Sequence, residues 1–179
     1  MSLERLIALV SPPEGSLDAG TPDQWLKVER ELGTPLPLDY KQLVNLFGVG
    51  FFAHWIYVNS PFSSQFRLGE PGLLEFIVSG REEMPEYYHP FSAYPNPGGL
   101  LPWGGDDNAR LFCWRTQGPP EQWTTVSLDN HYSNEYREFP LSMTEFLAGW
   151  LAGQLEGDWF PEDIEPASRQ VFTAGYRAT

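Results

Sequence analysis

LLPWGGDDNARLFCW, residues 100–114, is the stretch that predicts the fold, because it has the pattern of a β-hairpin. An apolar arm leads into a turn of Gly, Asp and Asn residues, and a second apolar arm leaves it and ends in a Trp. Gly104 and Gly105 can take positive φ without steric cost, and Asp and Asn side chains accept hydrogen bonds from nearby amides. The pattern therefore predicts a tight turn with Asp106 and Asp107 at its tip, where carboxylates can do chemistry, hold a partner or shape the turn.

The composition predicts one domain with a substantial core. The 179 residues are 41% apolar and include 7 Trp, 8 Tyr and 12 Phe, which argues against disorder despite 17 Gly and 17 Pro. The sequence contains no internal repeat. We expect a single domain over residues 1–179, with its core at about 20–155 and an acidic C-terminal extension over 156–179.

The charge balance is strongly acidic, with 24 Asp and Glu against 11 Lys and Arg and a formal net charge of -13. Nucleic-acid binding needs clustered cations that displace counterions, and the only lysines in the sequence are Lys27 and Lys41. We therefore expect no nucleic acid as a ligand. An acidic surface suits a basic protein partner, but acidity can also serve solubility alone, and both explanations stay open.

The cysteine count and the N-terminal sequence indicate the compartment. Cys113 is the single cysteine, so an intrachain disulfide is impossible and a reducing compartment is indicated. Residues 1–10 lack the basic start and long apolar stretch of a secretory signal, and no run reaches the ~18 apolar residues of a membrane span. The sequence predicts a cytoplasmic protein that does not contact a membrane.

Apolar periodicity predicts four helices. Thr21, Pro22 and Gln24 form a capping box for the first, which ends at Gly33. The second runs from residues 36–37 to Phe47, the third over 73–84, and the fourth starts at the capping box of Ser142 and Glu145 and should cover the sheet.

Aromatic and β-branched runs predict the strands. Residues 51–58 have the composition of one buried strand, and further strands are expected at about 123–128 and 136–139. Together with the hairpin at 100–114, the last two fit one antiparallel meander. Beyond them, the acidic stretch 156–165 is either a patch that faces a partner or a tail pinned by Trp159 and Phe160, and we favour the tail.

These residues, taken in order, resemble the SUKH superfamily, which includes the fungal cell-wall assembly regulators. The resemblance covers about residues 20–155 and depends on the order of the elements more than on any one motif. It is carried by Trp25, Val28-Glu29, Leu32-Gly33, Leu36-Pro37, Asp39-Tyr40-Lys41, Leu43, Phe47-Gly48, Gly50, Leu101-Pro102-Trp103-Gly104, Asp106-Asp107, Cys113-Trp114 and the helix from Ser142 to Leu147.

The resemblance implies an α+β fold, with a mainly antiparallel sheet covered by helices, and a non-catalytic protein-binding function. Bacterial members of the superfamily serve as immunity proteins that bind and neutralise toxins, often nucleases, so a basic toxin domain is the partner that it implies. A regulatory scaffold of a signalling or cell-wall complex is the alternative. As contacts for a partner we select the acids Asp106, Glu82, Glu83 and Glu86 and the aromatic residues Tyr87, Tyr88 and Trp123.

Enzymatic and metal chemistry have weak support in the sequence. Asp106 and Asp107 are adjacent and point in different directions, so a catalytic pair needs a carboxylate from elsewhere. The histidines at 54, 89 and 131 are far apart, and Cys113 sits in an apolar strand where a thiol usually packs as an inert hydrophobe. We expect no cofactor and no metal, and rank a small hydrolase or a carbohydrate-binding module third.

Overall fold

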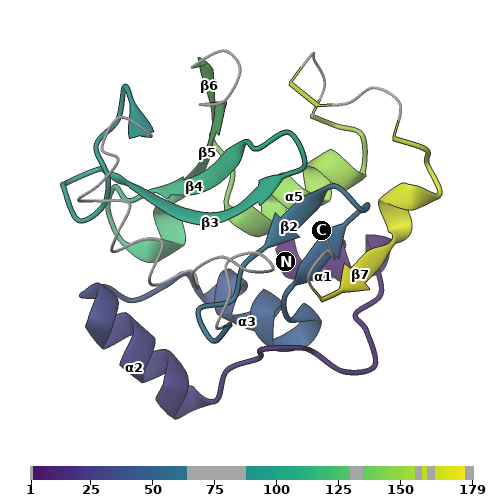
Figure 1. Ribbon diagram of the computed structural model, residues 1–179, viewed down its shortest axis with the longest axis horizontal. Coiled ribbons are helices and arrows are strands. Elements are labelled where there is room, and N and C mark those ends of the chain that lie inside the picture. Colours follow the sequence, from purple (N-terminus) through teal and green to yellow (C-terminus); the bar gives the residue numbers. More distant parts are fainter. Residues whose placement is uncertain (1, 64–87, 130–134, 156–158, 161–163, 176–179) are drawn as a thin grey trace.

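A computed structural model describes residues 2–63, 88–129, 135–155, 159–160 and 164–175. In the described residues the chain forms one α+β domain around a seven-stranded antiparallel sheet, whose strands are ordered β6-β5-β4-β3-β2-β1-β7 (Figure 1). The strands are β1 (Gly50–Phe52), β2 (Ile56–Val58), β3 (Leu100–Asp106), β4 (Leu111–Arg115), β5 (Thr124–Asp129), β6 (Glu135–Phe139) and β7 (Phe172–Ala174).

The predicted hairpin and meander are confirmed. β3 pairs with β4, β4 with β5 and β5 with β6, each antiparallel. The expected role of the two glycines is wrong, because Gly104 and Gly105 lie within β3 and the left-handed residue of the turn is Ala109, with φ 61°. A Cβ on Gly104 would lie 2.3 Å from the backbone oxygen of Tyr57 on β2. This glycine therefore permits a close approach of two strands beside the bulge between Pro102 and Gly104.

Residues 51–58 form two strands where the sequence predicts one. Ala53 and His54 both adopt left-handed conformations, with φ 50° and 57°, and they turn β1 back onto β2. Neither residue is a usual turn former, so the sequence carries no turn signal here. The reversal is supported from outside the hairpin, because β7 pairs with β1 and the Ala53 amide donates to the Val171 carbonyl over 2.9 Å.

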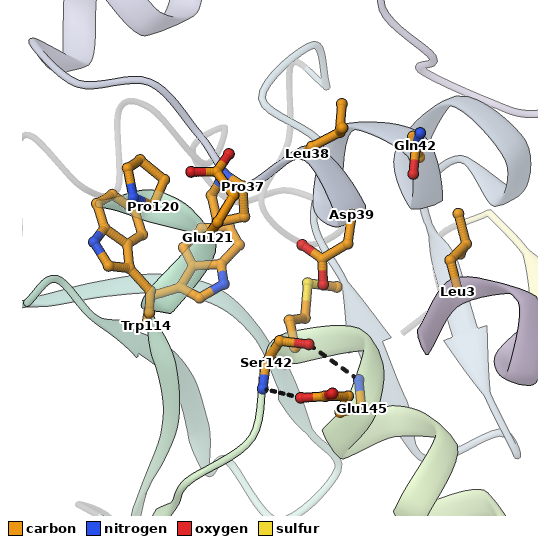
Figure 2. Close-up of a pocket in the computed structure, with 12 residues that line it drawn as sticks. Leu3, Pro37, Leu38, Asp39, Gln42, Trp114, Pro120, Glu121, Ser142 and Glu145 are labelled. Atoms are coloured by element: carbon orange, nitrogen blue, oxygen red, sulfur yellow. Dashed lines mark hydrogen bonds between the residues drawn. The ribbon is translucent and has the colours of Figure 1, made fainter. Parts of the chain in front are cut away.

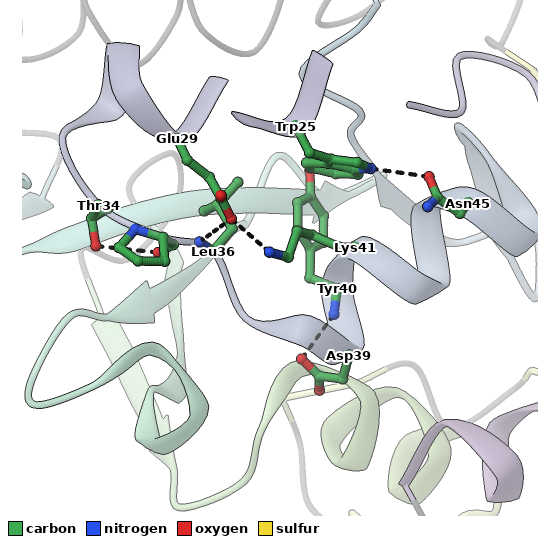
Figure 3. A network of polar contacts seen from close by, with 9 residues as sticks. Trp25, Glu29, Thr34, Leu36, Asp39, Tyr40, Lys41 and Asn45 are labelled. Carbon is green, nitrogen blue, oxygen red and sulfur yellow. Dashed lines mark hydrogen bonds and ion pairs between the residues drawn. The ribbon is translucent and has the colours of Figure 1, made fainter. Parts of the chain in front are cut away.

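The first two predicted helices are confirmed as α2 (Pro22–Leu32) and α3 (Leu38–Phe47). The capping box of Thr21 and Gln24 begins α2, and Gly33 ends it with φ 78°. A polar network joins the two helices: Glu29 accepts from the Lys41 ammonium at 2.7 Å and from the Leu36 amide at 3.0 Å (Figure 3).

Two further helices pack on one another and on α3. They are α5 (Met143–Leu151), which begins at the predicted capping box of Ser142 and Glu145 and packs on β5, and α1 (Ser2–Leu9), which the sequence analysis did not predict (Figure 1). The core between the helices and the sheet is aromatic: Trp103 stacks on Phe112, and Phe146 of α5 lies edge-on to Trp103. Trp25, Trp103, Trp114 and Trp150 are all buried.

The C-terminal tail is held by its two aromatic residues. Trp159 and Phe160 are buried, and the Trp159 indole N–H donates to the Ser127 hydroxyl on β5 over 2.9 Å. The preference for a pinned tail is confirmed at these two positions. The helix predicted over 73–84 lies outside the described residues.

Candidate functional site

The N-terminal ends of α3 and α5 meet at a surface pocket of about 500 Å³ (Figure 2). The remaining walls come from α1, from β4 and from the short helix η2 (Pro120–Gln122) with the residue that follows it. It is lined by Leu3, Pro37, Leu38, Asp39, Gln42, Trp114, Pro120, Glu121, Trp123, Ser142, Met143 and Glu145. A pocket of this size falls within the ~300–1,000 Å³ typical of binding sites.

Three carboxylates line the pocket, and two of them are fixed by hydrogen bonds. Asp39 accepts from the Thr144 hydroxyl at 2.6 Å and from the Tyr40 amide at 2.8 Å. Glu145 accepts from the Ser142 amide at 3.0 Å as part of the capping box. The third, Glu121, is exposed on η2. None of the described lining residues is basic, so the pocket is an acidic surface.

Lys27, Lys41 and Arg5 each have a partner that does not line the pocket. Lys41, the lysine on α3, forms its ion pair with Glu29 of α2, and Lys27 pairs with Glu31 at 3.8 Å on the same helix α2. Arg5 of α1 donates to the side chain of Gln154, which follows α5. Three of the 24 acidic residues in the sequence therefore line a pocket that has no basic lining residue.

Exposed leucines border the pocket along α3. Leu38, at the pocket rim, is 54% exposed, and Leu46 two turns later is 41% exposed. Leu46 lines a second hollow with Leu3 and Ile7 of α1, and this hollow shares Leu3 and Gln42 with the first. The outer face of α3 thus joins two hollows into one apolar and acidic surface, which we call the α1–α3 face.

The lining carboxylates do not form a metal site. In the part of the chain that the structure describes, no three His, Cys, Asp or Glu side chains come close enough together to hold a metal ion. Asp39, Glu121 and Glu145 are distributed around the pocket instead of converging on one point (Figure 2). Such an arrangement suits an extended organic cation better than a bare ion.

Asp106 is completely buried, at 0% exposure, and its carboxylate is hydrogen-bonded within its own turn. One carboxylate oxygen accepts from the amides of Asn108 and Arg110 at 2.9 and 3.0 Å, and the other lies 3.4 Å from the Arg110 guanidinium. Burial raises the pKa of Asp106 from its ordinary 3.8, opposed by the Arg110 amide and charge and by the Asn108 amide. The residue stabilises the hairpin turn and is not available to a partner or substrate.

Two further predicted contact residues are buried. Tyr88 is buried in the core, and Trp123 packs against Trp114, with its indole N–H donating to the Gly118 carbonyl. Their aromatic rings stabilise the core, because removing a large apolar ring from water favours the folded state. Trp123 nevertheless lines the pocket, and so contributes to the site. The other four, Glu82, Glu83, Glu86 and Tyr87, lie outside the described residues.

The sequence analysis missed the α1–α3 face, although part of its signal was present. Leu3, Leu6, Ile7 and Val10 have helical spacing, which predicts α1, and Leu38, Gln42 and Leu46 follow the same spacing on the outer face of α3. The meeting of Asp39, Glu121 and Glu145 has no local signal, because three distant segments supply them.

The thiol of Cys113 is buried in β4, as predicted, and burial raises its pKa well above the usual value. The described histidines, His54 and His89, lie outside the pocket. In the described residues, no helix has the length and apolar character needed to cross a membrane.

Comparison with protein families gives one match. The family model described as SMI1-KNR4 cell-wall, SUKH_6, matches residues 22–147, which is more than half of the chain. The matched region includes α2, α3, the hairpin and the start of α5, and it therefore spans most of the pocket walls. Neither the curated proteins nor the solved structures gave a match.

Proposed function

Because the chain belongs to the SMI1-KNR4 cell-wall family of the SUKH superfamily, we propose that it is a protein-binding immunity protein that neutralises a basic toxin inside a bacterial cell. The observation that carries this proposal is the α1–α3 face, where three carboxylates and exposed leucines occur together and no basic residue lines the pocket. A surface of this kind fits a basic partner by charge and by apolar contact.

Electrostatics on this face acts mainly on association. With a formal net charge of -13, the chain attracts a basic partner over a distance comparable to the Debye length, about 8 Å at physiological ionic strength. Carboxylates at the rim increase the association rate, and buried apolar contacts slow dissociation. A toxin that binds nucleic acid has a basic active surface, so an acidic protein can cover it.

The proposal is tested by measuring whether the chain protects cells from a toxin and whether it binds that toxin. The chain is co-produced with a candidate toxin, the product of a neighbouring gene being the first to test, and the proposal predicts that cells survive and that the two proteins co-purify. Glu121→Lys should reduce the association rate and flatten its dependence on salt, while Glu165→Lys is the matched control. Glu165 lies near the C-terminal end of α5, where Arg169 donates to the Trp150 carbonyl, at the opposite end of α5 from the pocket. A protein that binds without affecting survival would contradict the immunity function.

The family description as cell-wall supports a second candidate, a regulatory scaffold. It predicts a stable complex with a host protein and no effect on survival under toxin challenge. A catalytic function has no support at Asp106, because that carboxylate is buried and bonded within its turn. A carbohydrate-binding function, in which sugars stack on exposed aromatic rings, has no support at Tyr88 or Trp123, because both rings are buried.

A further inference from the structure

We propose that the pocket at the N-terminal ends of α3 and α5 receives one arginine side chain of the protein partner. The inference rests on the proposed function, and it specifies the chemistry that the partner presents at this site. It depends on the charge inside the pocket, the position of its acceptors and the nature of its walls.

Charge at the pocket favours a cation over an anion. The N-terminal ends of α3 and α5 attract anions, since each helix end carries a partial charge of roughly +0.5. Asp39, Glu121 and Glu145 together carry three negative charges at the same place. The sum is roughly -2, so the carboxylates outweigh the two helix ends.

The acceptors suit the geometry of guanidinium. The Asp39 carboxylate accepts from the Thr144 hydroxyl and the Tyr40 amide. The Glu145 carboxylate accepts from the Ser142 amide, and the Glu145 amide donates to the Ser142 hydroxyl in the other half of the capping box. They are spread around the pocket with Glu121 (Figure 2). A planar group with five N–H donors can reach several separate acceptors, whereas an ammonium is a compact point charge.

The walls suit the rest of the side chain. Pro37, Pro120, Trp114 and Trp123 supply apolar lining to the pocket. An arginine buries its aliphatic stem along such a surface while its head contacts the carboxylates, and guanidinium is more weakly hydrated than ammonium. Leu38 at the rim then packs against the partner residues next to the arginine.

The test uses N-acetyl-arginine amide as a probe and ¹⁵N NMR of the full chain at low salt. The probe should shift the indole N–H resonance of Trp123 and the amides of Asp39 and Glu121 saturably. The citrulline analogue has nearly the same shape without the charge, and it should cause no saturable shift. N-acetyl-lysine amide, which carries the same single charge as the arginine probe, should bind more weakly than it. Glu121→Gln should weaken binding of the arginine probe by about two- to five-fold, the range expected for one exposed ion pair, and Glu165→Gln should leave it unchanged.

Four results would overturn the assignment: no saturable binding of the arginine probe, equal binding of the citrulline analogue, equal binding of N-acetyl-lysine amide, or no effect of Glu121→Gln. If the arginine probe fails to bind while the chain still protects cells from the toxin, the arginine assignment is wrong and the proposed function stands. If the probe binds as expected but the chain gives no protection, the immunity function is wrong and the chemistry of the pocket stands.

Discussion

The hydroxyl of Thr144 donates to a carboxylate oxygen of Asp39 over 2.6 Å, joining two residues that are 105 positions apart in the sequence. Thr144 is fully buried in the first turn of α5, and Asp39 is half-buried in the first turn of α3. This bond holds the two helix ends side by side, so the fold and the wall of the pocket depend on the same contact.

Thr144→Val should destabilise the chain by about 1–2 kcal/mol, because it removes a hydrogen bond to a charged acceptor while keeping the shape of the side chain. Thr144→Ser is the matched control, since it keeps the hydroxyl. Urea denaturation of the two variants measures the difference in the free energy of unfolding. A loss of stability in Thr144→Ser with none in Thr144→Val would mean that packing of the methyl group, and not the hydrogen bond, stabilises this contact.

Gly104→Ala should destabilise the chain by about 2 kcal/mol or more, because the new Cβ would lie 2.3 Å from the backbone oxygen of Tyr57 and must push two strands apart. Gly15→Ala is the control, as a Cβ there meets nothing within 4 Å. Thermal unfolding compares the two. A Gly104→Ala protein as stable as the parent would show that β2 and β3 can separate at little cost.

Local patterns predicted much of this fold and little of the site. The capping boxes at Thr21 and Ser142 fix helix starts through contacts three residues apart, so they are readable from sequence. The reversal at Ala53 and His54 depends on β7, which is more than 100 residues away, and no local pattern encodes it. The sequence indicates Asp106 as a site residue because it is a carboxylate at a predicted turn, but in the structure its hydrogen bonds are made within that turn. The three acids of the pocket have no distinguishing local pattern, because they come together only when the helices pack.

Asp106→Asn should change how stability depends on pH. Burial raises the pKa of Asp106 in the folded chain, so the folded state binds its proton more tightly than the unfolded state does. The contribution of this group is therefore most favourable below its ordinary 3.8 and is lost as pH rises through the folded value. Asparagine does not titrate, and its oxygen can still accept from the amides of Asn108 and Arg110.

The measurement is the difference in free energy of unfolding between Asp106→Asn and the parent from pH 4 upward. That difference should move in favour of the variant as pH rises. A difference that is constant with pH would mean that the carboxyl titrates alike in the folded and unfolded chains. Asp107→Asn, at the exposed neighbouring position, controls for the general effect of removing one charge.

Trp159 and Ser127 should show a coupling energy of about 1 kcal/mol in a double-mutant cycle of Trp159→Phe and Ser127→Ala. The indole N–H donates to the serine hydroxyl over 2.9 Å, and both residues are buried. The guanidinium centres of Arg110 and Arg137 lie 4.9 and 5.4 Å from the Trp159 ring. Phenylalanine is the chosen replacement for Trp159 because its phenyl ring keeps an aromatic surface beneath these two groups. Additive losses in urea denaturation would contradict this hydrogen bond as the attachment of the tail.

Under the proposed function, Leu38→Ala should weaken binding of the toxin partner, chiefly by faster dissociation, because Leu38 offers an exposed apolar side chain at the pocket. Leu26→Ala is a closely matched control: Leu26 is a helical leucine on α2 that is 56% exposed, against 54% for Leu38. Both variants should stay within about 0.5 kcal/mol of the parent in stability, since surface substitutions rarely exceed this. Dissociation rates of the complex, measured by surface plasmon resonance, separate the two positions. Equal rates for both would place the toxin on another face of the molecule, and a larger effect of Leu26→Ala would move the interface to α2.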